Sequence, residues 1–160
     1  MAEPARASRG LWFEDFAPGQ KYETAPRPFP GRELDSFCEL TGRKHPLHLD
    51  DGFARKAGFR ARIAPGVYAL SLLSQSLEES GLIRNLVAIL GFDRVRFLSP
   101  LYPGETVRFT CEVLQTRATS KPDRGVVALR CRGFDGRGEG LLEADISVLI
   151  RRRASGPPTA

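Results

Sequence analysis

Two histidines and two aspartates lie close together in one polar stretch of the chain. The four residues are His45, His48, Asp50 and Asp51. Imidazole exchanges protons near neutral pH and a carboxylate can assist it, so this stretch could carry general acid–base chemistry. Each residue also has a structural interpretation. His45 could cap a neighbouring helix or bind backbone, and the aspartates could N-cap a helix at residues 52–57.

Helices are predicted on both sides of this polar stretch. Apolar residues at spacings of three and four predict a helix over residues 32–41, which Gly42 ends. A short helical segment is expected over residues 53–57. The same spacing predicts a long helix over residues 65–80, and its mostly apolar composition indicates that it is buried.

The C-terminal half of the chain is predicted to form strands. Apolar and polar residues alternate over residues 107–114, 127–131 and 142–150, which is typical of half-buried antiparallel strands. Gly-containing and Pro-containing segments at residues 122–125 and 135–138 supply the turns. One long helix and a set of long strands predict an α+β domain, with the helix against one face of an antiparallel sheet.

Length and composition restrict the possible organisation. The chain has 160 residues and a mass of 17.7 kDa, which is typical of a single domain. We assign that domain to residues 11–152. Residues 1–10 and 153–160 are rich in Ala, Pro, Ser and Gly, and we expect them to be disordered tails.

Several classes of protein are disfavoured by the sequence. Cys38, Cys111 and Cys131 are far apart and form no C-x-x-C pair, which argues against a disulfide framework or a metal site and for a reducing, cytoplasmic setting. The net charge of +5 comes from scattered arginines, whereas a nucleic-acid-binding protein gathers its charge on one face. No apolar stretch is long enough for a membrane span.

Three segments together carry a resemblance to a known family. They are Thr41–Asp50 (TGRKHPLHLD) followed by Phe53-Ala54, then Arg62–Gly66 (RIAPG), and then Val95–Thr106 (VRFLSPLYPGET). Their order and spacing resemble the MaoC-like dehydratase and R-specific enoyl-CoA hydratase family, over roughly residues 11–150.

The resemblance implies a hot-dog fold, in which a curved antiparallel sheet wraps a long central helix. It also implies addition or removal of water on a 2-enoyl or 3-hydroxyacyl thioester, which needs an acid–base group and donors for the enolate oxygen. By the family pattern, His48 has the acid–base role. The backbone N–H of Gly66 is the oxyanion donor, at a helix N-terminus that favours negative charge. The residues placed beside the substrate are His45, Asp50, Ala64, Pro65 and Ser74.

The resemblance also implies the partners. These are an acyl-CoA or acyl-carrier thioester as substrate, with no separate cofactor, and a second copy of the chain in a homodimer. Ser74 could instead donate to the carbonyl four residues earlier in its helix. The candidates for the wall of the acyl pocket are Val67, Leu70, Phe97 and Leu98.

Arg43 is a departure from the family pattern. It stands five residues before His48, where the family has its catalytic Asp. A guanidinium has no acceptor, so it cannot take a proton from water. Three interpretations follow: a weakened hydratase that uses His48 alone or with Asp50 or Asp51; a non-catalytic acyl-thioester binding protein in which Arg43 holds an anionic group; or a thioesterase on the same fold.

Overall fold

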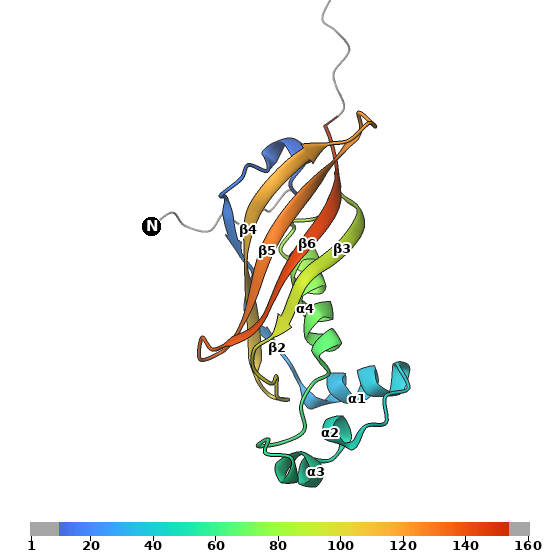
Figure 1. Cartoon of the computed structure of the whole chain (residues 1–160), viewed down its shortest axis with the longest axis vertical. Helices are drawn as coiled ribbons and strands as arrows, with labels where there is room; N and C mark the ends of the chain where they lie inside the picture. Colours follow the sequence, from blue (N-terminus) through green and yellow to red (C-terminus); the bar gives the residue numbers. More distant parts are fainter. Residues whose placement is uncertain (1–9, 154–160) are drawn as a thin grey trace, which may run out of the picture.

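Six strands form one antiparallel sheet, in the order β1-β4-β5-β6-β3, with β2 also paired to β4 (Figure 1). The strands are β1 (Lys21–Glu23), β2 (Arg27–Pro28), β3 (Leu86–Phe97), β4 (Thr106–Ala118), β5 (Arg124–Asp135) and β6 (Gly140–Arg151). The computed structural model describes residues 10–153. The three alternating segments predicted as strands lie within β4, β5 and β6.

Four α-helices accompany the sheet among the described residues. They are α1 (Gly31–Leu40), α2 (Pro46–Leu49), α3 (Asp51–Lys56) and α4 (Gly66–Glu79), and a short 3-10 helix precedes them at Phe13–Asp15. The predicted long helix is confirmed within one residue at each end, because Pro65 is the N-cap and Ser80 the C-cap of α4. Figure 1 shows α1, α2 and α3 gathered at the lower end of the molecule, where α4 begins.

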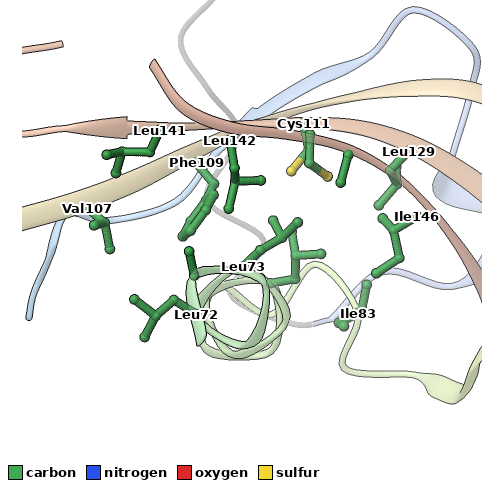
Figure 2. Close-up of a cluster of buried hydrophobic side chains, with 14 of the residues drawn as sticks. Leu72, Leu73, Ile83, Val107, Phe109, Cys111, Leu129, Leu141, Leu142 and Ile146 are labelled. Atoms are coloured by element: carbon green, nitrogen blue, oxygen red, sulfur yellow. The ribbon is translucent and has the colours of Figure 1, made fainter. Parts of the chain in front are cut away.

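The core lies between α4 and one face of the sheet. Leu73 on α4 points toward the sheet residues Phe109 and Leu142 (Figure 2), and these three side chains and Leu72 are buried. In β4, every second residue from Val107 to Val113 is buried, as the alternation predicts. Burial of these apolar surfaces holds the helix against the concave face, which is the α+β arrangement expected from the sequence.

The opposite face of the sheet is covered by ion pairs. Arg130 on β5 binds Asp145 on β6 at 3.1 Å, and Arg132 binds Glu143 at 3.1 Å. Opposite charges directly across an antiparallel pair stabilise the register. Arg132 and Glu143 on this face are solvent-accessible, and Asp145 is buried under its ion-pair partners, so the apolar helix packs on the other face.

Strand β3 follows α4 in the chain but pairs with β6, at one edge of the sheet. Its pairing register shifts three times, and the last shift lies between Asp93 and Arg96, where Arg94 has a φ of 51°. Positive φ is uncommon for a residue other than glycine, and here it belongs to a bulge. The strand then ends at Phe97, beside the start of α4.

The folded part reaches slightly beyond the predicted domain. Gly10 is buried, and the guanidinium of Arg153 binds Asp15 at 2.7 Å, so both residues belong to the domain rather than to the tails. The rest of the predicted tails, residues 1–9 and 154–160, lies outside the described residues. Within residues 10–153, no helix is long and apolar enough to cross a membrane.

Candidate active site

A cavity of about 260 Å³ opens beside the N-terminus of α4. One side is formed by Phe59, Ile63, Ala64, Gly66 and Ala69, and the other by residues 97–101 together with Leu141. The first set comes from the loop after α3 and the first turn of α4. The second set comes from the end of β3, the loop after it and the start of β6. The cavity is therefore enclosed by segments that are distant in the sequence.

Gly66 lies at the contact between these two sides. It is the first residue of α4, and among the described residues no acceptor for its backbone N–H is found. The ring of Phe97 packs so closely that a Cβ at position 66 would lie 2.6 Å from it. A glycine is needed here because of this contact. It leaves an unpaired donor at the positive end of a helix dipole, on the wall of an apolar cavity.

His48 is tied to the backbone that leads into this cavity. The half-buried ring places Nδ1 2.8 Å from the carbonyl oxygen of Ile63, and the N–H of Ile63 donates to the carbonyl of Leu47 at 3.2 Å. A carbonyl oxygen only accepts, so Nδ1 must carry the proton and donate it. In the neutral ring, Nε2 is then the nitrogen with a free lone pair, which is the form that can act as a base.

His45 and Asp50 both act as helix caps. Nδ1 of His45 accepts from the N–H of Leu47 at 3.2 Å, at the start of α2. Oδ1 of Asp50 accepts from the N–H of Phe53 at 2.8 Å, at the start of α3. The structural interpretation of these two residues is confirmed in geometry, and both are exposed. Neither lines the cavity among the described residues.

Arg43 lies over the ring of Phe37 and does not line the cavity. Gly42, with a φ of 65°, ends α1, and the N–H of Arg43 then donates to the carbonyl of Cys38 at 2.8 Å. This turn directs the chain away from α1. The guanidinium carbon of Arg43 lies 5.9 Å from the ring centre of Phe37, within the range of a cation–π contact. The residue is exposed and is absent from the cavity wall.

A polar contact joins α1 to the first turn of α4. The hydroxyl of Tyr68 donates to Glu33 at 2.7 Å, and Arg27 binds the same carboxylate at 3.0 Å. Burial and the hydrogen bond to Glu33 raise the pKa of Tyr68 well above its ordinary value. The phenol therefore remains neutral and keeps donating, which holds α1 against the start of α4.

The remaining predicted residues are divided between the cavity and its surroundings. Ala64 lines the cavity, Pro65 is the N-cap of α4, and Ser74 is half-buried two turns further along that helix. Ser74 has no side-chain hydrogen bond among those found for residues 10–153, so its expected bond to the carbonyl four residues earlier is absent there. Of the predicted wall residues, Phe97 and Leu98 line the cavity. Val67 and Leu70 do not.

Sequence reasoning did not find the rest of the wall. The missed residues are Phe59, Ile63, Ala69, Ser99, Pro100, Leu101 and Leu141. Five of them, all except Ala69 and Leu141, lie in irregular segments, where no periodicity marks which side chains point inward. Within the described part of the chain, no group of His, Cys, Asp or Glu side chains is arranged to hold a metal ion.

The fold and the cavity together define a hot-dog domain, with an apolar pocket at the start of its central helix. Comparison with known proteins identifies the family: residues 14–130 match the model of the MaoC like domain. The chain belongs to this family, as its three sequence segments indicated.

Individual proteins agree with this assignment. The chain is 32% identical over 155 residues to mesaconyl-CoA hydratase of Cereibacter sphaeroides, covering 96% of this chain and 45% of that protein. It is 28% identical to 3-hydroxybutyryl-CoA dehydratase of Methylorubrum extorquens, covering 95% and 92%. The chain thus spans less than half of the first relative and almost all of the second.

A solved structure shows the same fold. The structure titled monoamine oxidase regulatory protein from Archaeoglobus fulgius superposes with a TM-score of 0.81 at 31% identity, covering 93% of this chain and 99% of that one. Because the match covers nearly all of both chains, the predicted hot-dog fold is confirmed.

Proposed function

We propose that this chain is a hydratase or dehydratase that adds or removes water on a 2-enoyl or 3-hydroxyacyl-CoA thioester. The observation that carries the proposal is the pairing of a tethered imidazole with an unpaired backbone donor. His48 binds the carbonyl of Ile63, and Ile63 and Gly66 line the same cavity. The hydratase and dehydratase names of the two relatives support this type of reaction.

Each of these two groups has one step in the reaction. During hydration, Nε2 of His48 takes a proton from water as the oxygen attacks the β-carbon of the enoyl thioester. The negative charge that develops on the thioester oxygen is stabilised by the N–H of Gly66, at the N-terminus of α4. The protonated imidazole then returns a proton to the α-carbon. Dehydration runs through the same steps in reverse.

Arg43 makes the enzyme slower rather than inactive. The loss of one general acid or base reduces a rate by about 10²- to 10⁴-fold. The guanidinium of Arg43 lies over Phe37 and is not part of the cavity wall. It therefore does not block the pocket, and it does not place a positive charge inside the pocket that would repel a protonated His48. His48 therefore works without the carboxylate that other family members supply.

The test follows the absorbance of crotonyl-CoA as the double bond is hydrated. Wild-type protein should consume it, and His48→Ala should lose at least about 100-fold of the activity. The matched control is His45→Asn, which keeps an N-cap for α2 and should retain activity. Activity that survives His48→Ala would refute the proposed role of this residue.

Two further outcomes separate the alternatives. If only an Arg43→Asp variant hydrates crotonyl-CoA, while the wild type binds the thioester without turnover, the chain is a binding protein. If free thiol is released from the thioester at the rate of substrate loss, it is a thioesterase. An acyl-carrier thioester tested beside the CoA thioester shows which carrier is used.

We also propose a cytoplasmic homodimer, paired along β3. This strand has hydrogen-bond partners only in β6, and it forms one edge of the sheet. Leu90 on β3 is 54% exposed, although it is a large apolar residue. A second copy would cover this edge and supply the missing pairing. Light scattering should give twice the chain mass, and a monomer at micromolar concentration would refute the pairing.

The three free, buried cysteines are compatible with a reducing compartment.

A further inference from the structure

Among residues 10–153, none of those that line the cavity has a charged side chain, and Ser99 alone has a polar one. Its hydroxyl already donates to the carbonyl of Gly140 at 2.7 Å. With the N–H of Gly66 used by the thioester oxygen, a carboxylate on the acyl group would lose its water in this cavity without gaining a side-chain partner, which is strongly unfavourable. The cavity is therefore suited to an uncharged group.

Two cationic residues in the loop that lines one side of the cavity are bound elsewhere. Arg62 forms an ion pair with Asp35 on α1. Arg60 pairs with Glu105, and its guanidinium carbon lies 4.0 Å from the ring centre of Tyr102. Because each of these two guanidiniums already has a carboxylate partner, neither is free to turn inward and neutralise an anionic substrate group.

The cavity is also small. Its volume of about 260 Å³ lies below the ~300 to 1,000 Å³ that is usual for sites of drug-sized ligands. Phe97 limits it on the side of Gly66. The ring is 51% exposed, yet it remains in contact with the glycine at the start of α4. A large aromatic side chain kept at the opening restricts what can enter beside the oxyanion donor.

We propose that the acyl group of the substrate is short and uncharged, and that Phe97 is the residue that sets its size limit. This inference rests on the proposed function, since it places the thioester at Gly66 and the acyl chain among the apolar side chains of the cavity. It identifies a specificity residue on β3, outside the segment that carries His48.

Turnover of two enoyl thioesters tests the size limit. Wild-type protein should have a kcat/KM for crotonyl-CoA at least about tenfold above that for oct-2-enoyl-CoA, because a pocket discriminates by about tenfold or more for each methylene that does not fit. Phe97→Ala should reduce this ratio by about tenfold. The matched control is Arg96→Ala, on the same strand but outside the cavity wall, and it should leave the ratio unchanged. An unchanged ratio in Phe97→Ala would overturn the role of Phe97.

Binding separates a failure of this inference from a failure of the proposed function. Calorimetry compares butyryl-CoA, octanoyl-CoA and succinyl-CoA, which are saturated and do not react as enoyl thioesters. Tighter binding of butyryl-CoA than of the other two supports a short, uncharged acyl group, even if no enoyl thioester is turned over. In that case hydration is refuted and the pocket assignment stands. Equal or tighter binding of succinyl-CoA or octanoyl-CoA overturns the inference, even in an active hydratase.

Discussion

Gly66→Ala should separate the steric role of this glycine from its backbone donor. The new Cβ would lie 2.6 to 2.8 Å from three ring carbons of Phe97, about 1 Å inside normal contact. Forcing an extra methyl into a packed contact usually costs about 1–3 kcal/mol. Alanine in place of glycine in a helix returns up to about 1 kcal/mol. We therefore expect a net destabilisation of about 0–3 kcal/mol. The N–H itself is retained, so any loss of crotonyl-CoA hydration reports displacement of Phe97.

A double-mutant cycle makes this reasoning testable. In a Phe97→Ala background the ring is gone, so Gly66→Ala should be neutral or stabilising by up to about 1 kcal/mol. The two substitutions should then show a coupling energy of about 1–3 kcal/mol in denaturant unfolding. The same destabilisation by Gly66→Ala in both backgrounds would show that the ring is not what excludes a side chain at position 66.

Three other substitutions address the supporting contacts. Asp50→Ala should lower the free energy of unfolding by about 0.5–2 kcal/mol, because the N–H of Phe53 loses its cap. Asp50→Asn keeps a capping oxygen and should retain both stability and hydration activity. A large loss of turnover in Asp50→Asn without loss of stability would identify Asp50 as a catalytic carboxylate. Tyr68→Phe should lower the free energy of unfolding by about 1–3 kcal/mol, since Glu33 loses a buried donor; an unchanged urea midpoint would argue against that contact. Burial tends to raise the pKa of Asp135, but two backbone N–H groups and the guanidinium of Arg137 bind its carboxylate, and together they lower the pKa. The stability that this carboxylate contributes is therefore present above its unfolded pKa near 3.8. That stability is lost as the pH falls through the lower folded pKa. Asp135→Asn should remove that part of the acid dependence of the unfolding free energy, and an unchanged pH profile would contradict the assignment.

The elements with clear periodicity were predictable from the sequence, but their arrangement in the sheet was not. The buried helix α4 and the alternating strands β4, β5 and β6 follow directly from spacings of 3.6 and 2 residues. Nothing local places β3 beside β6 rather than beside β4, since that pairing depends on tertiary contacts. The bulges in β3 also obscure its alternation, and only its end, from Val95, was found through the family resemblance.

The site was predictable in part, for a similar reason. Gly66 and Ala64 were found because they belong to a motif at the start of a strongly periodic helix. Phe59 and Leu101 were missed because they lie in irregular segments, where the direction of a side chain depends on the packing of the whole loop. The partner of the His48 ring, the carbonyl of Ile63, is a backbone group and has no signature in the sequence.

The contact between the His48 ring and the carbonyl of Ile63 limits the effect of having Arg at position 43, where the family pattern has Asp. The ring of His48 binds the carbonyl of Ile63, and the N–H of Ile63 binds the carbonyl of Leu47, so two hydrogen bonds fix the loop to the segment that leads into Gly66. The proposed acid–base group, His48, is therefore tied by main-chain contacts to the segment that precedes the proposed oxyanion donor, Gly66, and residue 43 takes no part in these contacts. Under the proposed function, we expect a substitution at that position to alter the proton transfer that a carboxylate would assist and to leave the contacts around Gly66 unchanged. For this reason a residual hydratase rate is expected of this chain, and restoring the carboxylate should raise kcat more than it changes KM.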